Sequence, residues 1–195
     1  MKKWEMKIAR GYDPRTQNKI GLFAAQLDDQ LKRLKKEVKS LTVKQLEWQL
    51  NPGMNSVGML LAHISFAEVW WMKIAANELP WEPEGKKIMA RYCSIEDDGL
   101  PLLPDGHHPS FLKGFTAEKY LSILAKGRRA IHSEMKKWRD RDLDDFYKVG
   151  KGEVSHAATL HHVLEHFCGH FGQILLLKHL MRDAGILRKQ EKAKS

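Results

Sequence analysis

Apolar residues recur at spacings of three and four in four long segments of the chain, a pattern typical of amphipathic helices. The first segment carries the stripe Leu27, Leu31, Leu34 and Val38, with charged residues on its other faces. The pattern predicts helices over about residues 20–41, 56–77, 116–138 and 155–184.

Residues suited to helix ends stand at these boundaries. Ser56, Thr116 and Ser155 precede helical segments and can accept a backbone N–H of the first turn, and Gly185 follows the last segment. A shorter helix is predicted over residues 43–48, with Thr42 as its cap. Together these elements predict an all-α fold, a four-helix bundle with one long crossover connection between helices 2 and 3.

The connection between the second and third helices runs from about residue 79 to residue 115 and is rich in proline and glycine. A loop of this length inside a compact domain is usually functional or ordered by the rest of the fold. We find no alternating strand pattern and no internal repeat, so we expect residues 1–195 to form a single domain. Trp81, His107, His108 and Phe111 could line a pocket from this loop, although exposed loop positions are the preferred interpretation for the two histidines.

The net charge of +9 is concentrated at the two ends of the chain. Residues 1–19 carry six Lys/Arg against two acids, and residues 188–195 carry four against one, so the ends hold +7. Solvated, flexible ends explain this charge better than a nucleic-acid surface, because no recognition motif accompanies it. We therefore expect nucleic-acid binding to be absent.

The remaining composition is that of an ordinary globular protein. The two cysteines, Cys93 and Cys168, are far apart in sequence and form no CxxC pair, which fits free thiols in a reducing compartment. No apolar segment follows Lys2 and Lys3 as a signal peptide would require, and no uncharged run reaches the length of a membrane span. We expect a cytoplasmic protein without a membrane partner.

Histidine is concentrated near the C-terminus, where six of the ten histidines fall between His156 and His179. On a helix, His162, His166 and His170 share one face at successive turns, whereas Cys168 lies on the opposite side and is predicted to be a buried apolar residue. His162 and His170 are separated by a rise of about 12 Å, too far to share one ion. Hence His166 can pair with either neighbour, and a third ligand must come from another helix.

His63 is the natural third ligand. It is the single histidine of the second predicted helix and belongs to that helix's apolar stripe, which also includes Met59, Leu60, Ala67 and Trp70. A lone core histidine is usually a hydrogen-bonded packing residue. Several imidazoles in one core, however, would cost several kcal/mol of desolvation unless they shared a partner such as a metal ion.

Two segments of the chain together resemble the signatures of the DinB/YfiT-like superfamily of metalloenzymes. The first is Leu41-Thr-Val-Lys-Gln-Leu-Glu-Trp48 followed by Asn55-Ser-Val-Gly-Met-Leu-Leu-Ala-His63, and the second is His166-Phe-Cys-Gly-His170-Phe-Gly-Gln173. The resemblance implies metal ligands at His63, His166 and His170, with His162 as a neighbouring group. Phe171 departs from the pattern, since many members carry a basic residue there.

This resemblance also implies a function. Members include transferases that use low-molecular-weight thiols such as bacillithiol, mycothiol or glutathione, often as homodimers, so we expect a homodimeric metal-dependent thiol transferase acting on a small electrophile. Nitrogen ligands without thiolates suit one divalent zinc, nickel or iron ion. A metal-dependent hydrolase and a non-catalytic bundle that binds a metal or small ligand are the alternatives. No general base is evident, because Glu165 points to the side of the histidine stripe. Trp70 and Trp71 are interpreted as packing residues, one of which could line the site.

Overall fold

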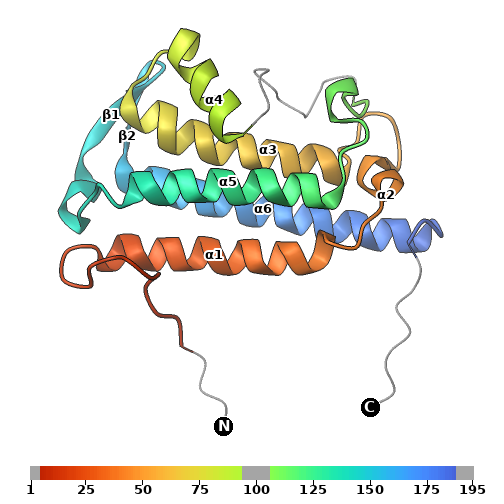
Figure 1. Cartoon of the computed structure of the whole chain (residues 1–195), viewed down its shortest axis with the longest axis horizontal. Helices are drawn as coiled ribbons and strands as arrows, with labels where there is room; N and C mark the ends of the chain where they lie inside the picture. Colours follow the sequence, from red (N-terminus) through yellow and green to blue (C-terminus); the bar gives the residue numbers. More distant parts are fainter. Residues whose placement is uncertain (1–4, 94–105, 188–195) are drawn as a thin grey trace.

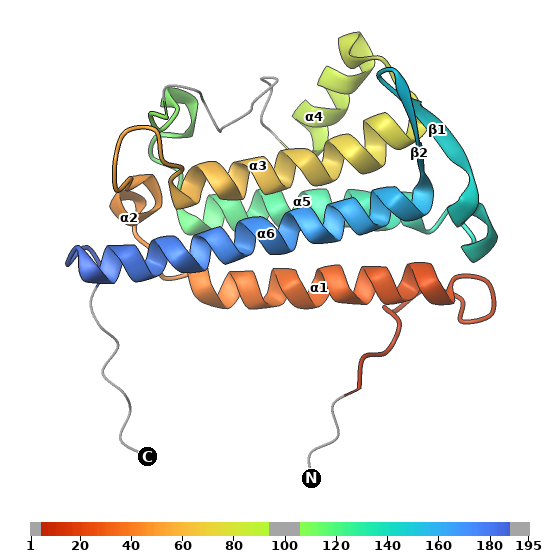
Figure 2. The same cartoon turned by 180° about the vertical axis from the view of Figure 1, so that it is seen from behind.

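A computed structural model describes residues 5–93 and 106–187, and it is mostly helical. Four helices run side by side along the molecule (Figures 1 and 2). They are α1 (Asn18–Val38), α3 (Val57–Val69), α5 (Ala117–Met135) and α6 (His156–Asp183). Two shorter helices, α2 (Val43–Glu47) and α4 (Lys86–Tyr92), lie at opposite ends of α3 (Figure 1). Part of the predicted crossover connection, residues 94–105, and the basic segments 1–4 and 188–195 lie outside the described residues.

The predicted helix caps are confirmed. Each of four residues before a helix accepts a backbone N–H of the first turn on its side-chain oxygen. These residues are Thr42, Ser56, Thr116 and Ser155. A cap of this kind is worth about 1 kcal/mol, so these four residues mark where α2, α3, α5 and α6 begin. The C-terminal ends are less well specified, because α1 stops at Val38 and α5 at Met135, three residues earlier than predicted in each case.

Helix α3 is the core helix. Twelve of its thirteen residues are buried, so the prediction of a single apolar stripe was wrong: neighbours cover α3 on all sides. The exception is His63, which is half-buried. The helical path then continues through a π turn (Trp70–Ile74) and a 3₁₀ turn (Ala75–Asn77). Among the described residues, the stretch Val57–Asn77 is long and apolar enough to cross a membrane, but 78% of its most apolar window is buried inside the protein, as in any core helix.

A small antiparallel hairpin precedes α6, and the sequence analysis missed it. Strand β1 (Phe146–Val149) pairs with β2 (Gly152–Ser155), with Phe146 opposite Ser155. The turn contains Gly150 at φ 59°, a left-handed conformation that glycine adopts without strain. Only Tyr147 is buried in either strand, so no alternating apolar pattern marked them.

The N-terminal segment packs more closely than a free end would. Within residues 5–17 of the predicted flexible end, Tyr12 and Gln17 are buried. The Gln17 amide donates hydrogen bonds to the backbone carbonyls of Lys136 and Trp138, at 3.0 and 2.7 Å. The segment therefore closes over the end of α5.

Close packing at the start of α3 makes a first prediction. A Cβ on Gly58 would lie 2.7 Å from the Tyr120 hydroxyl and 3.1 Å from the Leu46 carbonyl oxygen. We expect Gly58→Ala to lower the free energy of unfolding by about 1–3 kcal/mol, as overpacking does. Urea denaturation measures this, with Gly169→Ala as the matched control, because Gly169 has open space around it and helix propensity favours alanine there. Equal stabilities of the two variants would contradict the prediction.

Candidate metal centre

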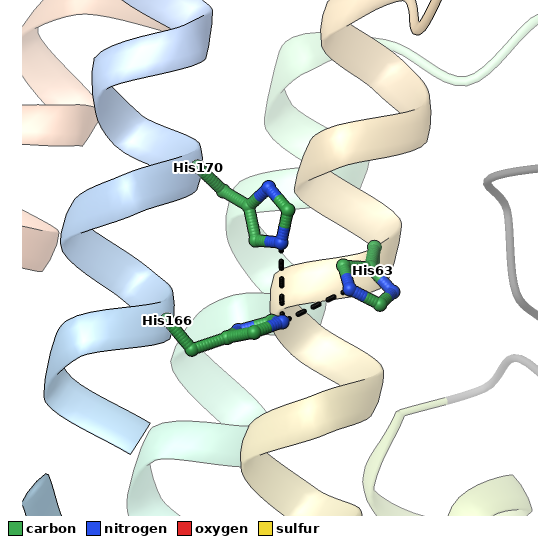
Figure 3. Close-up of side chains that lie close together, drawn as sticks. All are labelled: His63, His166 and His170. Carbon is green, nitrogen blue, oxygen red and sulfur yellow. Dashed lines mark hydrogen bonds between the residues drawn. The ribbon is translucent and has the colours of Figure 1, made fainter. Parts of the chain in front are cut away.

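Three histidine side chains from two helices meet between α3 and α6. His63 comes from α3, and His166 and His170 come from successive turns of α6. All three imidazole rings point toward one another (Figure 3). The structure thus brings together the three predicted ligands, although their binding of a metal stays a prediction.

The three Nε2 atoms converge on a small region. His166 Nε2 lies 2.9 Å from His63 Nε2 and 3.1 Å from His170 Nε2, and one ligand atom from each residue falls within 4.8 Å of the others (Figure 3). Two nitrogens bound at about 2.1 Å to one tetrahedral ion lie roughly 3.4 Å apart. Movements of about 1 Å or less, which side-chain rotation supplies, would fit an ion between these nitrogens.

A hydrogen bond from His170 to the Gln173 side chain fixes the orientation of the His170 ring. The Gln173 Oε1 atom lies 2.8 Å from His170 Nδ1. Because an amide oxygen only accepts hydrogen bonds, His170 carries its proton on Nδ1 and directs the lone pair of Nε2 toward His166. This is the arrangement in which an outer partner orients a metal-binding imidazole.

Burial keeps the other two imidazoles neutral. Desolvation lowers the pKa of His63 to about 4, and the nearby His170 adds to this shift. The pKa of His166 falls to about 3, again mainly through desolvation, with further contributions from His170, His63 and His162. At neutral pH both residues therefore present an uncharged ring with a lone pair available to bind a cation.

Counting protons shows that the cluster lacks a complete hydrogen-bond network of its own. With the His170 proton on Nδ1, the single proton of His166 must serve two acceptors at Nε2. His63 then carries its proton on Nδ1, which is buried and has no hydrogen-bond partner among the described residues. In this neutral arrangement two Nε2 lone pairs share one proton, and the His63 Nδ1–H donates to no acceptor among the described residues. A cation between the three rings would satisfy the lone pairs of all three.

The neighbouring residues have other partners. His162 packs edge-on against Trp71 at 4.8 Å between ring centroids, and its centroid lies 5.6 Å from that of His166. Its Nδ1 is 4.0 Å from the carboxylate of Glu165, which is exposed. Trp71 thus packs against His162, next to the three-histidine group. His162 is a neighbour of the three-histidine group and does not belong to it.

Cys168 and the two loop histidines lie outside the group. Cys168 is half-buried rather than buried, and desolvation raises the pKa of its thiol although Arg33 opposes this. His107 is exposed as expected. The same expectation was wrong for His108, which is half-buried because its Nδ1 lies 2.8 Å from the Ser56 hydroxyl at the start of α3.

The sequence profile of the DinB superfamily matches residues 26–174, which include all three histidines. The chain belongs to the DinB superfamily. Two solved structures share this DinB-like fold: a conserved protein from Enterococcus faecalis and a DinB-like protein from Bacillus cereus ATCC 10987. At 18% identity each, their likeness to this DinB protein concerns the fold alone.

The structural agreement extends over most of each chain. The Enterococcus protein aligns with a TM-score of 0.59 over 82% of this chain and 94% of its own. The Bacillus protein aligns with a TM-score of 0.54 over 92% of this chain and 99% of its own. Among curated proteins, none matches this DinB chain significantly.

Gln173 is the functional residue to which the sequence analysis assigned no role. It was quoted only as the end of a motif, yet its spacing of three from His170 places it one turn away on the same face. We expect Gln173→Ala to weaken zinc binding about 10- to 100-fold, because His170 would lose its orienting acceptor. Competition with a chromogenic chelator measures the affinity, and Gln173→Glu should retain it. An unchanged affinity in Gln173→Ala would exclude an orienting role.

Proposed function

We propose that His63, His166 and His170 hold one divalent transition metal ion and that the protein uses it as an enzyme acting with a small thiol. The observation that carries the proposal is the convergence of three Nε2 atoms whose protons cannot complete a network among themselves. Membership of a superfamily that is generally metal-binding supports it. Neutral imidazoles without thiolate ligands suit zinc, nickel or iron.

All three histidines are half-buried, so part of each side chain is accessible to solvent. When bound, such an ion supplies a Lewis acid with an open position, which acidifies a thiol or water or polarises a substrate. Helix α3 supports the site from the protein interior, because every residue of α3 except His63 is buried. Gln173 holds the His170 ring, and Trp71 covers the neighbouring His162.

The reaction we propose is transfer of a low-molecular-weight thiol to a small electrophile. Bacillithiol, mycothiol, glutathione and free cysteine are the thiols to test. Metal content is measured first by elemental mass spectrometry on tag-free protein, and turnover is then measured for each thiol with a panel of electrophiles. About one metal equivalent with turnover supports the proposal. One equivalent without turnover leaves a metal-binding protein, and no metal after reloading with zinc, nickel or iron overturns the proposal.

The lowered histidine pKa values make a prediction for the metal-free protein. Unfolded histidines titrate near pH 6.5, whereas His63 and His166 in the folded chain titrate at about 4 and 3. Between these limits the unfolded chain binds more protons, so the free energy of unfolding falls as the pH falls. We expect a contribution to this slope of up to about 1.4 kcal/mol per pH unit from each group.

Urea denaturation at several pH values, with a chelator present, measures this slope between pH 6.5 and 4. The double variant His63→Gln, His166→Gln should show a shallower dependence over the same range, because both depressed titrations are removed. A slope equal to that of the native chain would show that these two imidazoles do not cause it.

A further inference from the structure

A pocket of about 520 Å³ lies at the hairpin end of α3. Three segments form it: the π turn after α3, the corner at residues 78–81 and the hairpin turn at residues 148–150. Its apolar lining includes Trp70, Ile74, Ala75, Leu79, Trp81 and Val149. Two polar residues, Glu78 and Lys148, complete the wall. A mainly apolar lining with a few polar groups, in a volume of roughly 300–1,000 Å³, is typical of small-molecule sites.

Helix geometry places Trp70, one wall of this pocket, on nearly the same face of the helical path as His63. Trp70 follows His63 by seven residues, which is two turns, or roughly 10 Å along the axis and about 20° around it. A row of ring contacts also joins the two places. The Trp70 and Trp71 centroids are 4.9 Å apart, and Trp71 in turn packs against His162 beside His166.

The wall of the pocket is held in a defined shape. Glu78 has φ 50°, the left-handed conformation that a glutamate rarely adopts. Its carboxylate accepts the Lys148 backbone N–H at 2.7 Å, which ties the corner to strand β1. Backbone outliers of this kind occur where surrounding structure fixes a conformation, frequently at ligand-binding sites.

We propose that this pocket binds a flat apolar group of a small molecule against the indole rings of Trp70 and Trp81. Both rings are half-buried and pack on the core from one side, which leaves aromatic surface available for stacking. If the protein is the thiol transferase proposed above, on which this inference rests, the group bound here is the aromatic part of its electrophilic substrate. Low-molecular-weight thiols such as glutathione are polar and charged, and an apolar wall does not suit them.

Binding of 2-naphthol to metal-free protein tests the pocket directly. This probe is flat, mostly apolar and uncharged at neutral pH, so isothermal titration calorimetry reports the pocket without the histidine site. We expect saturable binding to the native protein and at least tenfold weaker binding to Trp70→Leu and Trp81→Leu. The matched control is Trp48→Leu, because Trp48 is also half-buried and packed on the same core but belongs to the end marked by α2 (Figure 1).

Val149→Asp provides a second variant in case a tryptophan variant fails to fold. Val149 is half-buried at the end of strand β1, so a charge there enters the pocket wall from outside the four long helices. Weaker naphthol binding by this variant supports the pocket. Absence of saturable binding to the native protein, or equal binding by native, Trp70→Leu and Val149→Asp proteins, overturns it.

A turnover assay separates this inference from the proposed function. The metal-loaded protein is given cysteine and a chloroacetamide joined to a naphthyl group through a short alkyl linker, so that the ring can lie in the pocket while the reacting carbon reaches the histidines. The thiol sulfur forms a bond to the carbon that bears chlorine, chloride leaves with the electrons of the C–Cl bond, and the thiol proton passes to solvent. We expect Trp70→Leu to raise the KM for the aromatic substrate about tenfold with kcat unchanged. An unchanged KM in Trp70→Leu would count against the pocket as the substrate site. If the native protein shows no turnover with cysteine, glutathione, bacillithiol or mycothiol but binds naphthol in a Trp70-dependent way, the transferase is overturned and the pocket is established.

Discussion

His166→Ala is expected to abolish stoichiometric metal binding. His166 is the central residue of the group, since its Nε2 lies within 3.1 Å of the Nε2 atoms of both His63 and His170 (Figure 3). Without it, the remaining two imidazoles come from different helices and would hold an ion with only two protein ligands. Loss of an outer partner alone costs 10- to 100-fold in affinity, so loss of this ligand should cost more than about 100-fold. Elemental mass spectrometry and chelator competition measure the change.

The matched control is His162→Ala, which removes an imidazole one turn away on the same face of α6. His162 packs on Trp71 and lies near Glu165, so metal content should remain at the native level in this variant. Equal metal content in His166→Ala and native protein would contradict the assignment. Loss of metal in both variants would instead assign the ion to His162 and His166, the other pair that the helical spacing allows.

The candidate metal ligands could be predicted from the sequence because their relative positions depend on residue spacing within single helices. His166 and His170 share a face through their spacing of four, and the caps at Ser56 and Ser155 fix the beginnings of the helices that carry the group. Helix geometry alone left His162 and His170 as equal partners. The choice of His170 came from the resemblance to the superfamily. In the structure, Gln173 holds the His170 ring within the three-histidine group, whereas His162 contacts Trp71.

Features that depend on tertiary contacts were not predictable in the same way. The hairpin at residues 146–155 has one buried side chain, Tyr147, and therefore no period of two. Helix α3 has no polar face, so its apolar pattern could not show which side faces α6. The π turn at Trp70–Ile74 contributes two residues to the pocket lining, and no residue type marks such a turn in advance.

A buried ion pair next to the site was likewise invisible in the sequence. Glu68 of α3 and Arg128 of α5 are 2% and 4% exposed. Arg128 Nη2 donates to Glu68 Oε1 at 2.5 Å, and a second contact from Nε to Oε2 measures 3.4 Å. The guanidinium also lies over the ring of Phe167, at 5.4 Å from its centroid. Because Phe167 follows His166 directly on α6, this pair holds three helices together beside the three-histidine group.

Arg128→Met is accordingly expected to lower the free energy of unfolding by about 3–5 kcal/mol, because it leaves the Glu68 carboxylate buried without a partner. Urea denaturation of the metal-free protein measures the loss.

The double variant Glu68→Leu, Arg128→Met should recover most of the lost stability, since well-packed apolar side chains often replace a buried ion pair at little cost. Lys137→Met is the control for removing a cation, because Lys137 pairs with Glu134 from an exposed position and Lys73 still binds that carboxylate. If Arg128→Met cost less than about 1 kcal/mol, or if the double variant were as unstable as the single one, the buried carboxylate would not be the source of the effect.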